Sequence, residues 1–136
     1  MKILQFLICL LLILLTSTSK GEVLNLTPKE LIAEQQKGTV IIDIRTPQEW
    51  IETGTIKKAK RIMFFNQQRQ PVVAQFMAEF EKLVTSKDQP FVLVCRSGSR
   101  TKAVTNFLDK KLGYSHVAHL VKGMKQWIAE KREVEK

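Results

Sequence analysis

Short apolar runs alternate along the chain with segments whose apolar residues recur at helical spacing. The runs Val40–Ile44, Phe91–Val94 and Val117–Leu120 are rich in β-branched or large apolar residues and predict buried strands. Capping signals and helical periodicity predict helices over about residues 27–38, 46–51, 71–86, 101–112 and 124–128. Short apolar strands that alternate with helices predict an α/β fold, with a central parallel sheet and helices on both faces.

Two of the predicted helices begin with the same sequence signal. The segments Thr27–Glu30 and Thr46–Glu49 both place a threonine before a proline and a glutamate three positions after the threonine. This order is typical of a capping box, with proline in the first helical turn. We therefore interpret Glu49 as a helix-capping residue.

The first residues do not fit the domain pattern. Lys2 is followed by the almost wholly apolar run Ile3–Leu15 and then by the small residues Thr16–Ser19. This order is typical of a secretory signal peptide. The alternative is a membrane anchor, but thirteen residues fall short of the ~20 that span a bilayer as a helix. We predict a cleaved signal peptide over residues 1–19 and one domain over residues 20–136.

Export narrows the choice of partners. After cleavage the chain keeps 21 Lys plus Arg, because Lys2 is removed, against 13 Asp plus Glu, so its formal charge is +8. Such a charge suits nucleic acid, an anionic membrane surface or small anions, and export disfavours nucleic acid. We interpret the basic run Lys57–Arg61 as a solvated loop. No metal-ligand cluster or nucleotide-binding glycine motif is visible, so we expect no metal and no cofactor.

Cysteine usage indicates a reactive site. Cys9 leaves with the signal peptide; it is a poor lipoprotein cysteine, because too little apolar sequence precedes it. Cys95 is then the only cysteine and cannot form a disulfide within the chain. It directly follows the predicted strand Phe91–Val94, and a helix is expected to begin near Thr101. In parallel sheets, ligands bind beyond the carboxyl ends of the strands.

The residues after Cys95 favour an anionic sulfur. A tight strand-to-helix loop can turn its backbone N–H groups inward, and Gly98 allows a conformation that other residues resist. The helix N-terminus adds positive potential, and Arg96 and Arg100 add full charges. Hydrogen bonds to the sulfur or a substrate are expected from the hydroxyl groups of Ser97, Ser99 and Thr101. The alternative is an inert buried cysteine, but so polar a loop belongs at a wet surface.

Four motifs in order resemble one family. They are Asp43–Trp50 (Asp-Ile-Arg-Thr-Pro-Gln-Glu-Trp), Ile56–Ile62, the cysteine loop Cys95–Arg100 and Gly123–Trp127. On these motifs the chain resembles single-domain rhodanese-like proteins, in particular the periplasmic thiosulfate sulfurtransferases linked to phage-shock operons. The resemblance runs from about Thr27 to Trp127. The chain departs from the family at Thr55, where a histidine is frequent, and at Lys58 and Lys122, where glycine is frequent.

The resemblance implies a rhodanese-like fold and a two-step sulfur transfer. The Cys95 thiolate attacks the outer sulfur of thiosulfate, sulfite leaves, and a thiophilic acceptor removes the sulfur from the Cys95 persulfide. Arg96 and Arg100 are expected to recruit the anionic donor. No histidine base is implied, and we interpret His116 and His119 as structural.

The resemblance also implies supporting residues and a location. Asp43 and Arg45 are expected to pair or to orient the cysteine loop rather than to contact substrate. Glu49 belongs to the same supporting group. We expect an exported protein, periplasmic in a Gram-negative source, with no stable membrane span after cleavage, no cofactor and a monomeric state.

Other functions are compatible with parts of the pattern. Cysteine phosphatases place five residues between the cysteine and the arginine, whereas four separate Cys95 from Arg100 here. The shorter loop suits one sulfur atom better than a phosphate, which disfavours a phosphatase or an arsenate reductase. Some rhodanese-like domains are non-catalytic binding modules, but these usually lose the cysteine. A sulfur carrier that works with a dedicated partner protein stays open.

Overall fold

The computed structural model describes residues 21–136, and the predicted signal peptide lies outside the described residues. The elements run in the order β1 (Leu24–Leu26), α2 (Pro28–Gln36), β2 (Val40–Asp43), α3 (Pro47–Thr53), β3 (Thr55–Ile56), β4 (Lys60–Arg61), α4 (Val73–Leu83), β5 (Phe91–Val94), α5 (Ser99–Asn106), the π-helical segment η1 (Phe107–Lys111), β6 (Val117–Leu120), α6 (Gly123–Ala129) and β7 (Val134–Glu135). None of the helices within residues 21–136 is long and apolar enough to cross a membrane.

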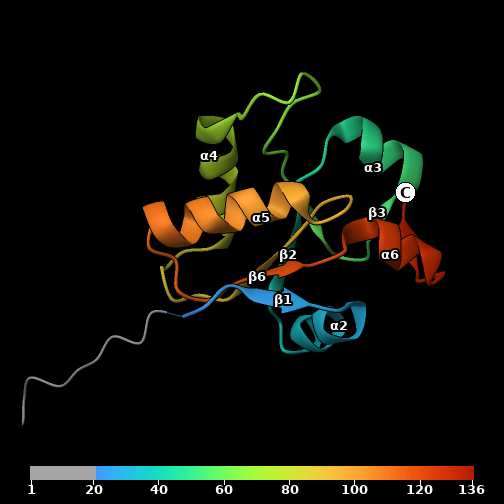
Figure 1. Cartoon of the computed structure of the whole chain (residues 1–136), viewed down its shortest axis with the longest axis horizontal. Helices are drawn as coiled ribbons and strands as arrows, with labels where there is room; N and C mark the ends of the chain where they lie inside the picture. Colours follow the sequence, from blue (N-terminus) through green and yellow to red (C-terminus); the bar gives the residue numbers. More distant parts are fainter. Residues whose placement is uncertain (1–20) are drawn as a thin grey trace, which may run out of the picture.

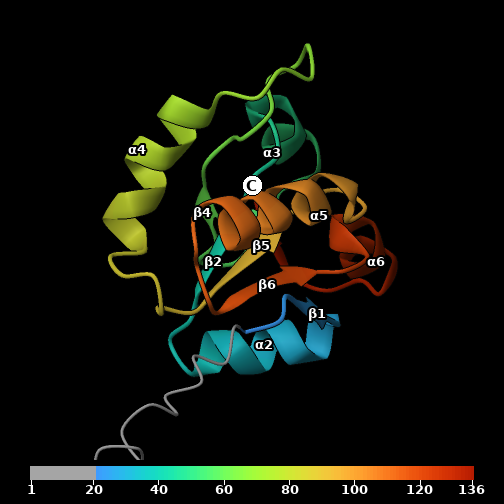
Figure 2. The same cartoon turned by 60° about the vertical axis from the view of Figure 1, so that its left-hand side comes forward.

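A five-stranded parallel sheet forms the centre of the molecule. Its strands lie in the order β1-β6-β5-β2-β4, and every neighbouring pair is parallel. The strands β3 and β7 form a separate antiparallel pair. Helices α4 and α5 lie on one side of the sheet and α2 and α6 on the other (Figures 1 and 2). The predicted α/β architecture, a central parallel sheet with helices on both faces, is confirmed.

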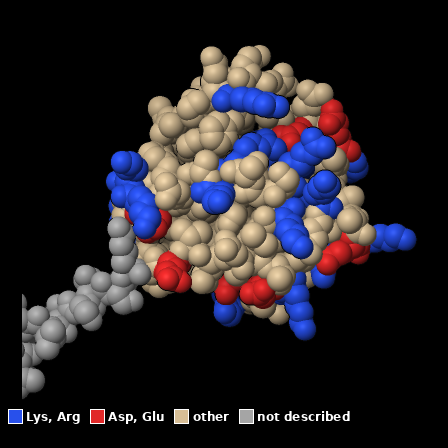
Figure 3. All heavy atoms as spheres, viewed as in Figure 1, with Lys and Arg blue, Asp and Glu red and all other residues tan. Residues whose placement is uncertain are grey.

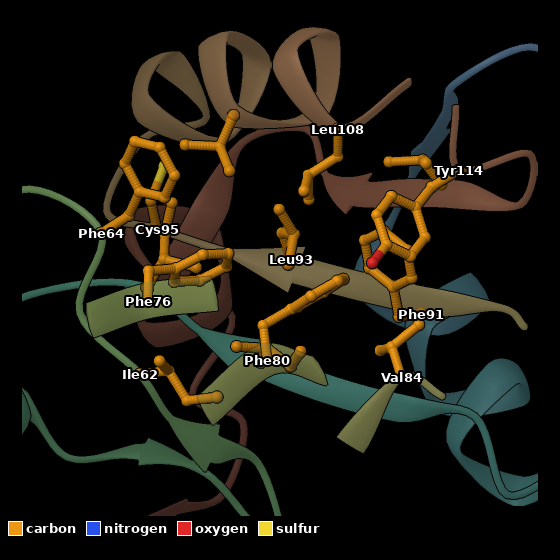
Figure 4. Packing of buried hydrophobic residues seen from close by; sticks show 14 residues of the cluster. Ile62, Phe64, Phe76, Phe80, Val84, Phe91, Leu93, Cys95, Leu108 and Tyr114 are labelled. Atoms are coloured by element: carbon orange, nitrogen blue, oxygen red, sulfur yellow. The ribbon is translucent and has the colours of Figure 1, made fainter. Parts of the chain in front are cut away.

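The alternation of side chains along β5 divides the core into two clusters. Phe91, Leu93 and Cys95 pack into the cluster beneath α4 and α5 (Figure 4), whereas Val92 and Val94 pack into the cluster that includes residues of α2 and α6. Each such side chain, once buried, contributes roughly 1.5–3 kcal/mol to stability. The same alternation directs the Cys95 side chain to the α4/α5 face of the sheet.

The two capping boxes form as predicted. Thr27 Oγ1 accepts from the Glu30 N–H at 3.3 Å, and Glu30 Oε1 accepts from the Thr27 N–H at the same distance. The box at α3 repeats the arrangement between Thr46 and Glu49. These boxes fix where α2 and α3 begin, and so fix the direction in which the chain leaves β1 and β2.

Some predicted boundaries are wrong. The helix after the cysteine loop begins at Ser99 rather than near Thr101, and the helix expected over residues 71–86 is confined to Val73–Leu83. Strands β1, β3, β4 and β7 were not predicted. Each has only two or three residues, too few for a periodic pattern, and each depends on the strand beside it.

Candidate functional site

Cys95 lies at the carboxyl end of β5, and its side chain is fully buried. The backbone N–H of Gly98 donates to Cys95 Sγ at 3.1 Å. Thr101 Oγ1 lies 3.4 Å from the same sulfur. The sulfur therefore faces one backbone donor and one hydroxyl group, and both can stabilise negative charge on it.

Gly98 is needed by both the conformation and the packing of this loop. Its φ of +95° lies in the left-handed region that favours glycine. A Cβ atom at this position would overlap the backbone carbonyl of Val121, which follows β6. The glycine predicted to shape the loop therefore does so, and it also lets β6 lie close to the cysteine.

The start of α6, which follows β6, is hydrogen-bonded to the cysteine loop. Met124 N–H donates to the Cys95 carbonyl at 2.9 Å, and Lys125 N–H donates to the Arg96 carbonyl at 2.9 Å. Gly123 has a φ of +61°, and a Cβ there would come within 2.6 Å of the Cys95 carbonyl oxygen. Gly123 belongs to the motif Gly123–Trp127, but the sequence alone does not indicate its role. The structure shows that it allows α6 to donate to the cysteine loop.

An open pocket of about 750 Å³ lies over the loop. Its lining includes the loop residues Arg96, Ser97, Ser99 and Arg100. Arg96 and both serines are exposed, whereas Arg100 is half-buried. The residues predicted to bind an anionic donor therefore form one wall of a pocket, while Gly98 and Thr101 lie buried beside the sulfur.

Glu49 does more than cap α3. Its two carboxylate oxygens accept from the two terminal nitrogens of Arg100 at 2.7 and 2.8 Å. Burial alone would raise the pKa of Glu49, but the hydrogen bonds from Arg100 and from the Thr46 backbone lower it to about 2. The hydrogen bonds between Arg100 and Glu49 also raise the pKa of Arg100. The charge of Arg100 is therefore largely balanced within the protein, which the sequence did not predict.

Arg96 is placed differently. None of the ion pairs within residues 21–136 includes Arg96. Its side chain is exposed at the pocket and also borders a smaller cavity beside Met124 and Lys125. Of the two loop arginines, Arg96 has the charge that remains available to an incoming anion.

Asp43 and Arg45 form a buried ion pair at the end of β2. Arg45 donates to both carboxylate oxygens of Asp43, with the shortest bond at 2.8 Å. Thr55 Oγ1 donates to Asp43 Oδ2 at 2.6 Å, and Arg45 donates to the Gly54 carbonyl at 2.6 Å. The pair joins the end of β2 to the end of α3 and the start of β3. Thr55, the departure from the family pattern, supplies a hydrogen bond in this network.

His119 lies closer to the cysteine loop than sequence reasoning suggested. Its Nδ1 lies 2.7 Å from Thr101 Oγ1, and its Nε2 lies 2.8 Å from Asn25 Oδ1. Burial and, to a smaller extent, the charge of Lys102 lower the pKa of His119. The alternation of side chains along β6 could have predicted this position. His119 lies two residues after Val117 and so shares its face of the sheet, which packs beneath α5. His116 is exposed and contacts Ser115 instead.

Sequence comparison assigns the family. The model of the rhodanese-like domain matches residues 27–130, which is most of the chain and includes the cysteine loop, Glu49 and His119. The chain belongs to the rhodanese-like family. No curated protein matches the chain.

Solved structures share the fold. A rhodanese-related protein from Thermoplasma volcanium is 23% identical with a TM-score of 0.61, and the match covers 82% of this chain and 97% of that one. A possible tyrosine phosphatase from Rhodopseudomonas palustris is also 23% identical with a TM-score of 0.61, over 83% and 85% of the two chains. A thiosulfate sulfurtransferase from Pseudomonas aeruginosa is 18% identical with a TM-score of 0.64, over 83% of this chain and 20% of that one. At these identities the likeness concerns the fold alone.

Proposed function

We propose that this protein is an exported thiosulfate sulfurtransferase that carries sulfur as a persulfide on Cys95, of the type linked to phage-shock operons. One observation carries the proposal: the Gly98 N–H donates to Cys95 Sγ at the carboxyl end of β5, in a loop whose Arg96, Ser97 and Ser99 side chains are exposed to a pocket. The fold shared with a thiosulfate sulfurtransferase supports this function.

The proposed reaction has two balanced steps. The Cys95 thiolate forms an S–S bond to the outer sulfur of thiosulfate, and the S–S bond of thiosulfate breaks to release sulfite. A thiophilic acceptor, cyanide in an assay or a thiol in the cell, then takes the outer sulfur and restores the thiolate. Gly98 N–H and Thr101 Oγ1 are placed to stabilise the sulfur anion of the first and last states. Arg96 attracts the dianionic donor, because it is exposed at the pocket and forms no ion pair within residues 21–136.

Intact-mass measurement tests the proposal. The purified chain is measured before and after incubation with thiosulfate, beside a Cys95→Ala variant. We expect the wild type to gain one sulfur atom, cyanide to remove it as thiocyanate, and the variant to gain nothing. No gain by the folded wild type, with Cys95 confirmed as reduced, would exclude thiosulfate as the donor.

A phosphatase is the alternative that a solved structure raises, since a possible tyrosine phosphatase shares the fold. Two features disfavour it here. Only four residues separate Cys95 from Arg100. Arg100 also donates to both carboxylate oxygens of Glu49, so its terminal nitrogens are not available to bind a phosphate. Hydrolysis of p-nitrophenyl phosphate that depends on Cys95 would favour the phosphatase. A binding module would show neither sulfur gain nor hydrolysis.

We further propose export with removal of residues 1–19, and a monomeric state in the destination compartment. The apolar run Ile3–Leu15 and the small residues after it support export. N-terminal sequencing of the protein recovered from the exported fraction tests this. A chain that begins at Lys20 is expected, whereas an intact Met1 in the membrane fraction would indicate an anchor.

A further inference from the structure

A buried chain of hydrogen bonds leads away from Cys95. It passes from Cys95 Sγ to Thr101 Oγ1 over 3.4 Å, from Thr101 Oγ1 to His119 Nδ1 over 2.7 Å, and from His119 Nε2 to Asn25 Oδ1 over 2.8 Å. The first three side chains are buried, with exposures of 0%, 0% and 4%. The four residues come from the end of β5, from α5, from β6 and from β1, so the order of the sheet brings them together.

The donors and acceptors among these groups define the direction of each hydrogen bond along this path. The oxygen of the Asn25 side chain can only accept, so the proton of a neutral His119 lies on Nε2 and Nδ1 is left as an acceptor. The single hydroxyl proton of Thr101 can be donated to His119 Nδ1 at 2.7 Å or to the Gly98 carbonyl at 3.1 Å. The shorter distance favours Nδ1. The lone pairs of Thr101 Oγ1 then face the thiol of Cys95.

We propose that His119 is a positioning residue that takes up the thiol proton of Cys95 through Thr101. The S–H bond of Cys95 breaks and its proton passes to Thr101 Oγ1, while the hydroxyl proton of Thr101 passes to His119 Nδ1. The products are a Cys95 thiolate, an intact threonine hydroxyl and an imidazolium. This inference deepens the proposed function, because it rests on Cys95 as the nucleophile.

Both states satisfy the hydrogen bonds of the chain. In the imidazolium, Nδ1–H donates to Thr101 and Nε2–H donates to Asn25, and the Thr101 hydroxyl donates to the thiolate. The Gly98 N–H supplies a second hydrogen bond to the sulfur. No side chain of this hydrogen-bonded path has to turn when the proton moves.

The charges around His119 act in opposite directions. Burial, followed by the charge of Lys102 on α5, lowers the pKa of His119 and so favours the neutral ring in the resting protein. Both effects oppose formation of the imidazolium, which therefore needs a compensating negative charge. The charged side chains that share its pocket of about 700 Å³ are Glu22, Lys102, Asp109 and Lys110. The two carboxylates favour the imidazolium and the two lysines disfavour it. The Cys95 thiolate, once formed, also favours the imidazolium.

The test measures the rate at which iodoacetamide alkylates Cys95 as a function of pH, with no sulfur donor present. The variant His119→Asn keeps a polar atom near the position of Nδ1 but cannot take up a proton. We expect the midpoint of its pH profile to move up by about one unit, so that its rate falls about tenfold at any pH below both midpoints. His116→Asn is the matched control, since His116 is exposed and contacts Ser115, and it should keep the wild-type profile.

Variants of Thr101 test the link itself. Thr101→Val removes the hydroxyl at nearly constant shape and should reproduce the shift of His119→Asn, and the double variant should shift no further. Thr101→Ser restores the hydroxyl and should restore the profile. A wild-type profile in folded His119→Asn would overturn the proposal. If His119→Asn does not fold, equal profiles of the valine and serine variants would overturn it instead.

The outcome is independent of the sulfur donor. A shifted alkylation profile together with no gain of sulfur from thiosulfate would support the proton path and reject the donor. A sulfur gain with unshifted profiles would support the proposed function and reject the role of His119.

Discussion

At the scale of single residues, the ion pair between Glu49 and Arg100 decides which charges the site offers. Both side chains are about a quarter exposed, and two hydrogen bonds join them. The pair also links α3 to α5, because Glu49 begins one helix and Arg100 lies in the first turn of the other. A residue that the sequence identifies as a cap therefore also orients the arginine of the cysteine loop.

The pair makes stability depend on pH in a defined window. The pKa of Glu49 is lowered from 4.5 to about 2 in the folded state, so its stabilising effect is complete above about pH 5 and is lost as the pH falls toward 2. Comparison of the wild type with Glu49→Gln by urea unfolding should show a difference of about 1–3 kcal/mol at pH 6, allowing for partial exposure of the pair. The difference should vanish near pH 2.

The matched control for this prediction is Glu79→Gln. Glu79 forms an exposed ion pair with Lys82, and exposed pairs contribute little, so this variant should stay close to the wild type at every pH. A difference between wild type and Glu49→Gln that did not change with pH would contradict the assignment, because it would reflect lost packing rather than lost charge.

At the scale of elements, α6 acts as a clamp on the cysteine loop. Its first residue, Gly123, comes so close to the loop that the backbone of α6 donates to the carbonyls of Cys95 and Arg96. The other end of α6 is fixed by Trp127, whose Nε1–H donates to the Glu133 carbonyl at 2.9 Å. The spacing of glycine and tryptophan in this motif thus joins the loop to the C-terminal segment.

Gly123→Ala should therefore affect both stability and chemistry. The added Cβ would meet the backbone of Cys95 and Arg96, and φ at +61° already disfavours any other residue. We expect a loss of about 1–3 kcal/mol in the free energy of unfolding and a loss of sulfur transfer that exceeds the unfolded fraction. Urea unfolding and the persulfide mass assay measure the two effects.

Gly113→Ala provides the comparison. Gly113 has a φ of +78°, but open space surrounds the position of its Cβ, so only the left-handed conformation costs energy, about 1–2 kcal/mol. Its activity per folded molecule should equal that of the wild type. Equal activities of both alanine variants would contradict a clamping role for α6.

The parts of the fold that sequence could predict are those specified locally. The strands β2, β5 and β6 are four-residue segments of mostly apolar residues, and the starts of α2 and α3 are encoded within four residues each. The short strands β1 and β4 form because β6 and β2 offer them hydrogen-bonding partners, which no local pattern encodes.

The candidate site also has a part specified locally and a part that depends on distant contacts. The cysteine loop is contiguous from Cys95 to Thr101, so its place after β5 and the need for glycine at position 98 could be predicted from the sequence alone. His119 and Asn25 reach the loop only because β6 lies between β1 and β5, and the pairing of Glu49 with Arg100 spans 51 positions. Such contacts depend on strand order and helix placement, so the sequence analysis could name Glu49 but not its second role.

At the scale of the whole molecule, positive charge would favour encounter with the proposed anionic donor. The chain has a formal net charge of +9. Lys and Arg side chains are distributed across the face seen in Figure 3 rather than confined to one stripe. Near the site, Arg96 is exposed while Arg100 is balanced by Glu49. A broad positive field, with the exposed Arg69 and Arg96 at the pocket, suits a small anion better than an extended polyanion.

This field predicts that salt slows the first step of sulfur transfer. Between about 0.02 and 0.5 M NaCl, screening shortens the reach of exposed charges from roughly 20 Å to under 5 Å. We expect the second-order rate constant for sulfur transfer from thiosulfate to Cys95, followed by stopped flow or quenched mass measurement, to fall about three- to tenfold over this range. Alkylation of Cys95 by neutral iodoacetamide is the control and should change little, because no charge attracts the reagent. Equal salt dependence of the two reactions would show that salt acts on the thiolate or on the fold, and that the positive field does not steer the donor.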